Sequence, residues 1–305
     1  MTGIFSLDMA LGGGLPLRII TEIYGKSNTN KSTLGYYLAG RVSTVWGGEI
    51  HIADFEGLNK KYLGSTLRQA GAKGIKVTLI PQTEKLKDDS VVPLASERRL
   101  EELHTRFTSG GSCAAIIDPV SAIPVTAEVE GNIGDANMGR RAHVVAQFIR
   151  TVLPWVTAKS PPANVFLINH SFDNMGGMTQ GQHTAGGDTV RNGSALRLRL
   201  RVVEREEDDS RVVLGTVDKF RFREGGEPQT FKFVTIPNFG IHVGLSAVQD
   251  CIDFGLTSGD RTITLDGKSY GYRKTLRENY LDQDRFIPFI KALDALRVGS
   301  QENSQ

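Results

Sequence analysis

Short apolar runs alternate with longer amphipathic segments over the first two thirds of the chain. Residues 18–24, 49–55, 76–81, 113–118 and 164–169 are mostly apolar, as in RIITEIY and CAAIID, and predict strands. Between them, apolar residues recur every three or four positions, which predicts helices. Apolar strands joined by helices are typical of an α/β fold with a mainly parallel, twisted sheet.

The pattern changes after about residue 195. Residues 195–204, 211–222 and 230–236 predict consecutive strands with short polar turns, hence a β-rich extension of the sheet. Two helical patterns then flank a short hairpin in ITLDGKSYGYR. We therefore expect a core domain over residues 1–243 and a small α+β domain over residues 244–305.

Composition restricts the class of protein. Hydrophobic residues make up 39% of the 305 residues and charged residues 23%, an ordinary globular mixture. The net charge of +2 does not by itself indicate a nucleic-acid partner. Cys113 and Cys251 form no disulfide framework and no metal pattern, which favours a reducing compartment. With no signal peptide and no apolar run of membrane-spanning length, we expect a cytoplasmic protein with no membrane partner.

Residues 24–33, YGKSNTNKST, have the skeleton of a phosphate-binding loop and lie between a predicted strand and a predicted helix. There Lys31 would neutralise phosphates at the helix N-terminus, and the Ser32 hydroxyl would ligate Mg²⁺. Asn30 stands where the motif has a second glycine, and asparagine tolerates positive φ better than most residues. The alternative is a polar strand-to-helix turn that contains a lysine by chance.

Two strand ends carry carboxylates. CAAIIDP ends a strand at Asp118, where a magnesium ligand is wanted, and IADFEG places Asp54 and Glu56 at the end of another. Strand alternation puts Asp54 and Glu56 on one face near the carboxyl edge of the sheet, where a carboxylate could orient an attacking water. Strands that end in aspartate are common, and Glu56 could equally be a solvated loop residue.

At residues 116–150, IIDPVSAIPVTAEVEGNIGDANMGRRAHVVAQFIR, the sequence resembles the RecA family of strand-exchange recombinases. In that family a strand that ends in aspartate runs into a segment of this kind at the same spacing. IADFEG, the INH strand end, AGGDTVRNGSALRLRLRV and VDKFRF also follow in family order. The resemblance covers most of the chain and implies a RecA-like P-loop ATPase core with a small C-terminal lobe.

The resemblance implies ATP and Mg²⁺ as cofactors. Asp118 matches the aspartate that holds the magnesium ion with Ser32, and Glu56 matches the glutamate that activates water. Asn59 and Tyr62 resemble the pair that brackets adenine. The residues that match the triphosphate loop are Gly25, Lys26, Ser27, Asn28, Thr29, Asn30, Lys31, Ser32 and Thr33.

Three further residues match catalytic positions of the family. His170 occupies the place of a glutamine that senses the γ-phosphate, and histidine can make that hydrogen bond with differently placed donors. Lys219 and Arg221 resemble a cation pair that reaches the ATP of a neighbouring subunit and stabilises charge on the γ-phosphate. The alternatives are a strand-end histidine and an ordinary basic strand face.

Two segments match the DNA-contacting loops of the family, residues 131–138 and about 171–190. His143 takes the place of a usual arginine, so part of that contact could shift to Arg141. The alternative for the arginines is a solvated helix face. The residues expected at DNA are Gly131, Asn137, Met138, Arg140, Arg141, Arg150, Met175, Gly186, Gly187 and Arg191.

These features favour an ATP-dependent recombinase of the short, phage-like sort, active in the host cytoplasm if phage-encoded. It would bind single-stranded and duplex DNA, form a homo-oligomer or helical filament, and hydrolyse ATP when bound to DNA. The second hypothesis is an accessory paralogue with weak hydrolysis, favoured by Asn30 and by the short segment that precedes the core. The third is a RecA-fold ATPase with no role at DNA.

Overall fold

The computed structural model describes residues 1–87, 89–124, 139–173, 182–223, 229–258 and 262–302. By their tertiary contacts these residues divide into two compact units. The sheet unit comprises residues 16–201 and 216–229, and the terminal unit comprises residues 1–15, 202–215 and 230–305. The domain boundary expected after residue 243 is a different division of the chain and stays a prediction.

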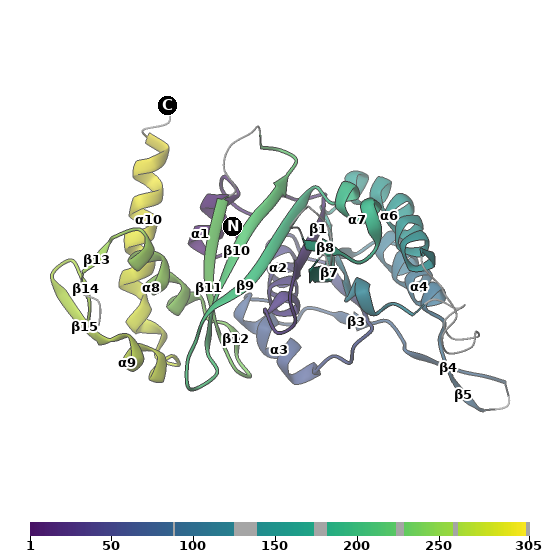
Figure 1. Cartoon of the computed structure of the whole chain (residues 1–305), viewed down its shortest axis with the longest axis horizontal. Helices are drawn as coiled ribbons and strands as arrows, with labels where there is room; N and C mark the ends of the chain where they lie inside the picture. The colour runs from purple at the N-terminus through teal and green to yellow at the C-terminus, as the bar shows by residue number, and fades with distance from the viewer. Residues whose placement is uncertain (88, 125–138, 174–181, 224–228, 259–261, 303–305) are drawn as a thin grey trace. The chain divides into compact units, whose positions relative to one another are not determined.

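The sheet unit contains the predicted parallel sheet (Figure 1). Its strands lie in the order β9-β1-β7-β6-β2-β3, and β1, β2, β6 and β7 pair in parallel with their neighbours. Strand β1 is buried at every position, as expected for a strand covered on both faces. The bounds are β1 (Ile20–Gly25), β2 (Glu49–Asp54), β3 (Val77–Leu79), β6 (Ser112–Asp118), β7 (Asn164–Asp173) and β9 (Leu196–Arg205).

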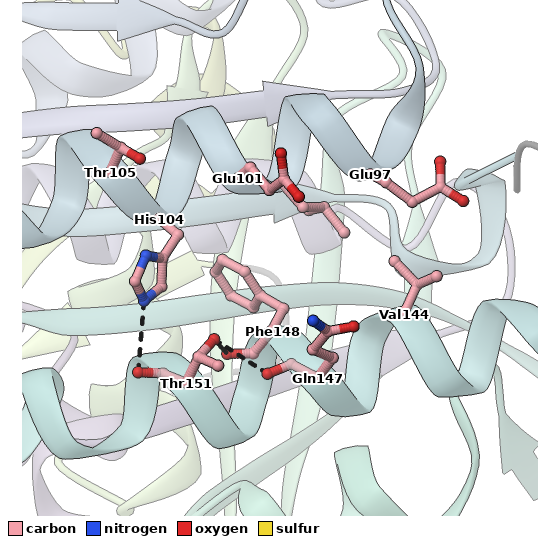
Figure 2. Close-up of a pocket in the computed structure, with 9 residues that line it drawn as sticks. Glu97, Glu101, His104, Thr105, Val144, Gln147, Phe148 and Thr151 are labelled. Atoms are coloured by element: carbon pink, nitrogen blue, oxygen red, sulfur yellow. Dashed lines mark hydrogen bonds between the residues drawn. The ribbon is translucent and has the colours of Figure 1, made fainter.

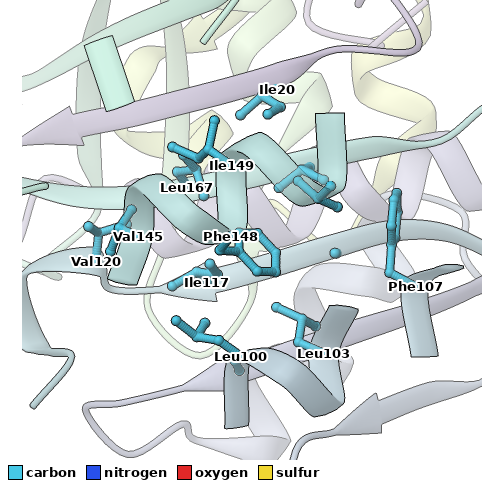
Figure 3. Close-up of a cluster of buried hydrophobic side chains, with 14 of the residues drawn as sticks. Ile20, Leu100, Leu103, Phe107, Ile117, Val120, Val145, Phe148, Ile149 and Leu167 are labelled. Carbon is cyan, nitrogen blue, oxygen red and sulfur yellow. The ribbon is translucent and has the colours of Figure 1, made fainter. Parts of the chain in front are cut away.

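Helices pack on both faces of this sheet. On one face Leu100, Phe148 and Ile117 belong to one core cluster, shown in Figure 3. On the other face Gly35 packs against Ile168, where an added Cβ would lie 2.6 Å from the side chain. The helices are α2 (Lys31–Trp46), α3 (Lys60–Gln69), α4 (Ser96–Thr108), α6 (Arg140–Ala158) and α7 (Gly187–Gly193).

The terminal unit combines both ends of the chain around a second core. Phe5 near the start packs with Val234, Leu245, Phe286 and Phe289. The predicted hairpin is present as β14 and β15, joined by β13 into an antiparallel three-stranded sheet. Its elements are α1 (Phe5–Ala10), β11 (Gln229–Ile236), β12 (Gly240–Ile241), α8 (Val243–Asp253), β13 (Thr257–Ser258), β14 (Thr262–Leu265), β15 (Lys268–Tyr272), α9 (Arg273–Glu278), η2 (Gln283–Phe286) and α10 (Ile287–Glu302). Strand β10 (Arg211–Phe220), like β9, has residues in both units.

The structure adds elements that the pattern did not predict. Among these are α1, the short turn η1 (Val120–Ala122) and a small hairpin of β4 (Thr83–Lys85) and β5 (Val91–Pro93). The expected DNA loop of residues 171–190 is partly regular, because β7 continues to Asp173, β8 (Gln182–Thr184) pairs with it, and α7 begins at Gly187. Over the residues described, no helix is both long and apolar enough to cross a membrane.

A buried carboxylate ties α8 to α1. Asp250 is fully buried, and its Oδ2 accepts a hydrogen bond from the Ser6 backbone N–H at 3.1 Å. Its Oδ1 is also buried and has no hydrogen-bond partner among the described residues. Burial raises the pKa of Asp250 to about 7, against the lowering effect of the bonds to Ser6.

Asp250→Asn should flatten the pH dependence of stability. Because the pKa of Asp250 rises to about 7 from its ordinary value of 3.8, the folded state holds a proton that the unfolded chain releases. Stability should therefore fall as pH rises from about 4 to 7, by up to about 1.4 kcal/mol per pH unit from this group. The amide keeps the acceptor for Ser6 and should remove this slope. Denaturant unfolding across this pH range measures it; Asp284→Asn, at an exposed site, should leave the slope unchanged.

Candidate functional site

Four parallel strands end at one edge of the sheet. Gly25 on β1 is in register with His170 on β7, and Asp54 on β2 is in register with Asp118 on β6. Since β7 and β6 are themselves parallel neighbours, these four residues lie along the same carboxyl edge. The structure therefore brings together the predicted phosphate loop and the predicted strand-end residues.

The loop after β1 requires glycine at its start. A Cβ on Gly25 would lie 2.4 Å from the Leu200 carbonyl oxygen and 2.9 Å from Thr29 Oγ1, which leaves no room for a side chain. At the other end, Asn30 adopts φ 62° and ψ 28°, the left-handed conformation expected for the motif glycine. Its carboxamide oxygen is buried and has no hydrogen-bond partner among the described residues.

Lys31 begins α2 and is buried, with only 6% of its surface exposed. Its Nζ donates to the Lys26 carbonyl oxygen at 2.7 Å, and Thr29 Oγ1 donates to the same oxygen at 2.9 Å. Burial lowers the pKa of Lys31 to about 8, while the charges of Asp118 and Glu56 raise it. A phosphate group would give this buried cation a charged acceptor. The side chains of Ser27 and Asn28 are exposed on the same loop.

Ser32 and Asp118 are in direct contact. Ser32 Oγ donates to Asp118 Oδ1 at 3.1 Å, and the Tyr36 hydroxyl donates to Asp118 Oδ2. Burial raises the pKa of Asp118, whereas the bonds from Tyr36 and Ser32 lower it. A hydroxyl and a carboxylate are oxygen ligands that suit Mg²⁺, which otherwise keeps its waters. No group of three or more His, Cys, Asp or Glu side chains within the described ranges could hold a metal ion.

Glu56 lies beyond the strand, so the alternation argument for Asp54 and Glu56 was wrong. Strand β2 ends at Asp54, whose carboxylate accepts hydrogen bonds from the backbone N–H groups of Glu56, Gly57 and Leu58 at 3.2, 3.0 and 2.7 Å. These bonds form a tight turn that presents the Glu56 side chain, which is 58% exposed. Glu56 Oε1 lies 3.2 Å from His170 Nε2, so two of the predicted catalytic residues meet.

The two residues expected at adenine are engaged in the protein itself. Asn59 Oδ1 accepts hydrogen bonds from the backbone N–H groups of Lys61 and Tyr62, at 3.0 and 3.1 Å, and caps α3. The Tyr62 hydroxyl lies 2.9 Å from Thr33 Oγ1 on α2. These contacts hold α3 beside the phosphate loop; a role for this pair at the base stays a prediction.

Lys219 and Arg221 contact the end of α7. Lys219 Nζ donates to the carbonyl oxygens of Arg191 and Asn192 at 2.9 and 3.2 Å, and Arg221 donates to Asn192 at 3.0 Å. The pKa of Lys219 is lowered by burial and by the charges of Arg221, Arg197 and Arg191. Their expected action on a neighbouring subunit stays a prediction.

The residues expected at DNA are partly described. Arg140 and Arg150 are exposed on α6, while Arg141 Nε donates to the Ile123 carbonyl oxygen at 2.7 Å. His143 is exposed on the same helix, between the two exposed arginines. The expected residues Gly131, Asn137, Met138 and Met175 lie outside the described ranges.

Gly186 and Gly187 form the turn that leads into α7. Both have positive φ, 89° and 69°, and a Cβ on Gly186 would lie 2.5 Å from the Val190 side chain. These glycines thus allow α7 to start close to its neighbours. Arg191 is exposed in the last turn of this helix.

A buried network behind the strand edge was missed from the sequence. Asn169, next to His170, donates from Nδ2 to Glu22 Oε1 at 3.0 Å and to the Ala185 carbonyl oxygen at 2.8 Å. Glu22 is fully buried and also pairs with Arg197 at 2.5 Å. The sequence did hold a signal for this network: a glutamate and an asparagine stand inside two otherwise apolar strands. Because buried polar groups need hydrogen-bond partners, these two residues could have been predicted to pair.

A separate groove lies between α4 and α6 (Figure 2). It measures about 400 Å³, and Leu100, Val144 and Phe148 contribute its apolar lining. Glu101 and His104 contribute polar groups, and His104 Nε2 lies 3.4 Å from the Thr151 carbonyl oxygen. None of the residues predicted for nucleotide or DNA lines this groove.

Comparison with known proteins agrees with the geometry. The sequence profile of the RecA N-terminal domain matches residues 1–232. Protein RecA of Chlorobium chlorochromatii (strain CaD3) is 30% identical over 260 residues, which cover 85% of this chain and 68% of the relative. Protein RecA of Nautilia profundicola is 32% identical over 205 residues, or 66% of this chain and 53% of the relative. The crystal structure of the RadB recombinase has a similar fold, with a TM-score of 0.54 at 20% identity, over 79% of this chain and 97% of that one.

Asn30→Ala should lower the midpoint of thermal unfolding, and Asn30→Gly should not. Alanine at the φ of 62° found here costs about 1 kcal/mol or more, whereas glycine adopts this conformation freely and removes a buried oxygen that lacks a partner. Ser27→Ala, at an exposed position of the same loop, should leave the midpoint unchanged. Equal midpoints for the alanine and glycine variants would show that residue 30 is not held in the left-handed conformation.

Proposed function

The chain belongs to the RecA family, whose N-terminal domain matches residues 1–232. On this basis we propose that it is an ATP-dependent recombinase. It would bind single-stranded DNA and promote pairing and strand exchange with duplex DNA. The observation that carries the proposal is the contact of Ser32 Oγ with Asp118 Oδ1 at 3.1 Å, directly after a loop in which Asn30 adopts the left-handed conformation.

The loop and the start of α2 would hold the phosphates of ATP. The backbone N–H groups at the N-terminus of α2 favour an anion, and Lys31 adds a buried positive charge. Ser32 and Asp118 would hold Mg²⁺, which supplies charge neutralisation at the phosphates when it is bound. Glu56, presented by the Asp54 turn, would orient the attacking water.

His170 would connect the nucleotide to the DNA segment. Its Nε2 lies 3.2 Å from Glu56 Oε1, and the same strand continues to Asp173, inside the predicted DNA segment that begins at about residue 171. A change in the Glu56–His170 contact would therefore act on β7 directly. The exposed arginines of α6 and Arg191 of α7 would bind the phosphates of the strand without reading its sequence. We propose a homo-oligomer or filament in which Lys219 and Arg221 act on the neighbouring nucleotide.

The second candidate is an accessory protein that binds ATP and DNA but hydrolyses ATP slowly. Two observations favour it. The buried carboxamide of Asn30 occupies space beside the phosphates that a glycine would leave open. In addition, Glu56 Oε1 contacts His170 at 3.2 Å, so one oxygen of the predicted base is already engaged by the protein.

Turnover of ATP should be stimulated by single-stranded DNA and depend on two residues. Lys31→Ala should weaken nucleotide binding, whereas Glu56→Gln should keep binding and lower turnover by about 100-fold or more, because it removes the base. Steady-state phosphate release with and without an oligonucleotide measures this. Glu207→Gln, at an exposed turn, is the matched control. Turnover indifferent to DNA would rule out the leading proposal, and nucleotide binding with negligible turnover would support the second.

The double variant Arg140→Ala with Arg150→Ala should weaken DNA binding and its salt dependence. Removal of each arginine that binds a phosphate should reduce the slope of log affinity against log salt concentration by about 1. Fluorescence anisotropy of a labelled oligonucleotide from low to high salt gives the slope. Arg98→Ala removes an arginine whose charge is paired with Glu84 at 2.7 Å and should leave the slope unchanged. A wild-type slope in the double variant would place the DNA elsewhere.

A further inference from the structure

Arg99 on α4 reaches the end of β2, where the turn that carries Glu56 begins. Arg99 is only 7% exposed, and its Nη2 donates a hydrogen bond to the Asp54 carbonyl oxygen. The central carbon of its guanidinium group lies 4.1 Å from the centroid of the Phe55 ring. Through one planar group, Arg99 therefore contacts both of the residues that directly precede Glu56.

Other groups hold the same two residues. Gln82, which follows β3, donates from Nε2 to Asp54 Oδ2 at 3.1 Å. The Phe55 backbone N–H donates to the Asp118 carbonyl oxygen at the end of β6, at 2.7 Å. Arg99 adds the contact from α4, so the backbone before Glu56 is held by three separate segments of the sheet unit.

Packing alone does not explain an arginine at this position. A buried cation costs free energy unless it is paired, and the Arg99 Nε has no hydrogen-bond partner among the described residues. Burial lowers the pKa of Arg99, while the charge of Asp54 raises it. An apolar side chain could cover the Phe55 ring without that cost. What the guanidinium adds is a charged hydrogen bond to a main-chain oxygen and a planar contact with a ring, and both depend on direction.

The direction of the Glu56 side chain matters for the reaction. Because this side chain is 58% exposed, its position is set mainly by the backbone that carries it and by the contact with His170. A general base acts only within hydrogen-bond distance of the proton that it accepts, and a misplacement of about 1 Å can cost about 100-fold in rate.

We propose that Arg99 is a positioning residue for ATP hydrolysis, which fixes the turn after β2 so that Glu56 is directed at the attacking water. This inference rests on the proposed function and adds to it a residue of α4 that acts through Glu56 and not on the nucleotide. The contacts with Asp54 and Phe55 are the means by which it does so.

The test compares Arg99→Met and Arg99→Lys with the unaltered full-length chain, each also in a Glu56→Gln background. Methionine keeps an unbranched side chain against Phe55 but has no donor, whereas lysine keeps a cation and a donor. Arg98→Met is the matched control, because Arg98 precedes Arg99 on α4, its side chain is 61% exposed and it pairs with Glu84. Phosphate release with saturating single-stranded oligonucleotide and Mg²⁺, over a range of ATP concentrations, gives kcat and KM.

Arg99→Met should lower kcat by about tenfold or more and leave KM for ATP unchanged, because Lys31 and Ser32 are not altered. In the Glu56→Gln background the same change should have no further effect on kcat, since the base that Arg99 positions is already absent. Arg99→Lys should restore kcat to within about threefold of the unaltered chain. Arg98→Met should match the unaltered chain in every measurement.

A second measurement does not depend on turnover. The backbone N–H groups of Glu56, Gly57 and Leu58 donate to the Asp54 carboxylate, so their hydrogen exchange reports whether the turn is closed. Arg99→Met should speed this exchange by about tenfold, as expected for the loss of one charged hydrogen bond that holds the turn. Exchange in α2 should stay that of the unaltered chain.

Three results would overturn the inference. If Arg99→Met keeps the kcat of the unaltered chain, or its hydrogen exchange at residues 56–58, the arginine does not position the base, and the proposed function stands. A further decrease of kcat in the Glu56→Gln background would mean that Arg99 supports the fold in general. If the unaltered chain hydrolyses no ATP, the proposed function fails and the inference fails with it.

Discussion

The register of four parallel strands is the constraint on which the candidate site depends. Backbone hydrogen bonds place Gly25 beside His170 and Asp54 beside Asp118, so the residues meet at one edge although up to 145 positions separate them in the sequence. A slip of one residue would turn each strand-end side chain to the opposite face. Because β1 and β6 are buried at every position, such a slip would also misalign their side chains with the packing on both faces of the sheet.

At this edge, hydrogen bonds within the protein position the predicted site residues Glu56 and Asp118. The Asp54 carboxylate accepts hydrogen bonds from three backbone N–H groups and so fixes the turn that carries Glu56. Tyr36 lies one helical turn after Ser32 and donates to the carboxylate that Ser32 also contacts. Asp118 is therefore held from α2 as well as by its position at the end of β6.

The sequence predicted the parallel sheet and the strand-end acids because both depend on local patterns of period and polarity. The argument that strand alternation positions Glu56 was wrong, since β2 ends at Asp54 and the chain turns there, with backbone N–H groups donating to the Asp54 carboxylate. The pairing of Lys219 with the end of α7 and of Asn169 with Glu22 also escaped prediction. These contacts join residues 28 and 147 positions apart, and no periodic pattern encodes such pairs.

Asn30 and His170, two residues that differ from the family pattern, take part in different contacts of the site. Asn30 keeps the left-handed backbone that the phosphate loop requires, so the N–H groups of α2 remain directed at an anion. His170 keeps a hydrogen bond to Glu56, although its ring nitrogens are placed differently from the donor of an amide side chain. In the proposed function, nucleotide binding would depend on the first feature, and the contact between Glu56 and β7 depends on the second. Under the proposed function, therefore, the backbone at Asn30 would act on nucleotide binding and the His170 contact on coupling to DNA, and the two would be separable although both residues lie at one strand edge.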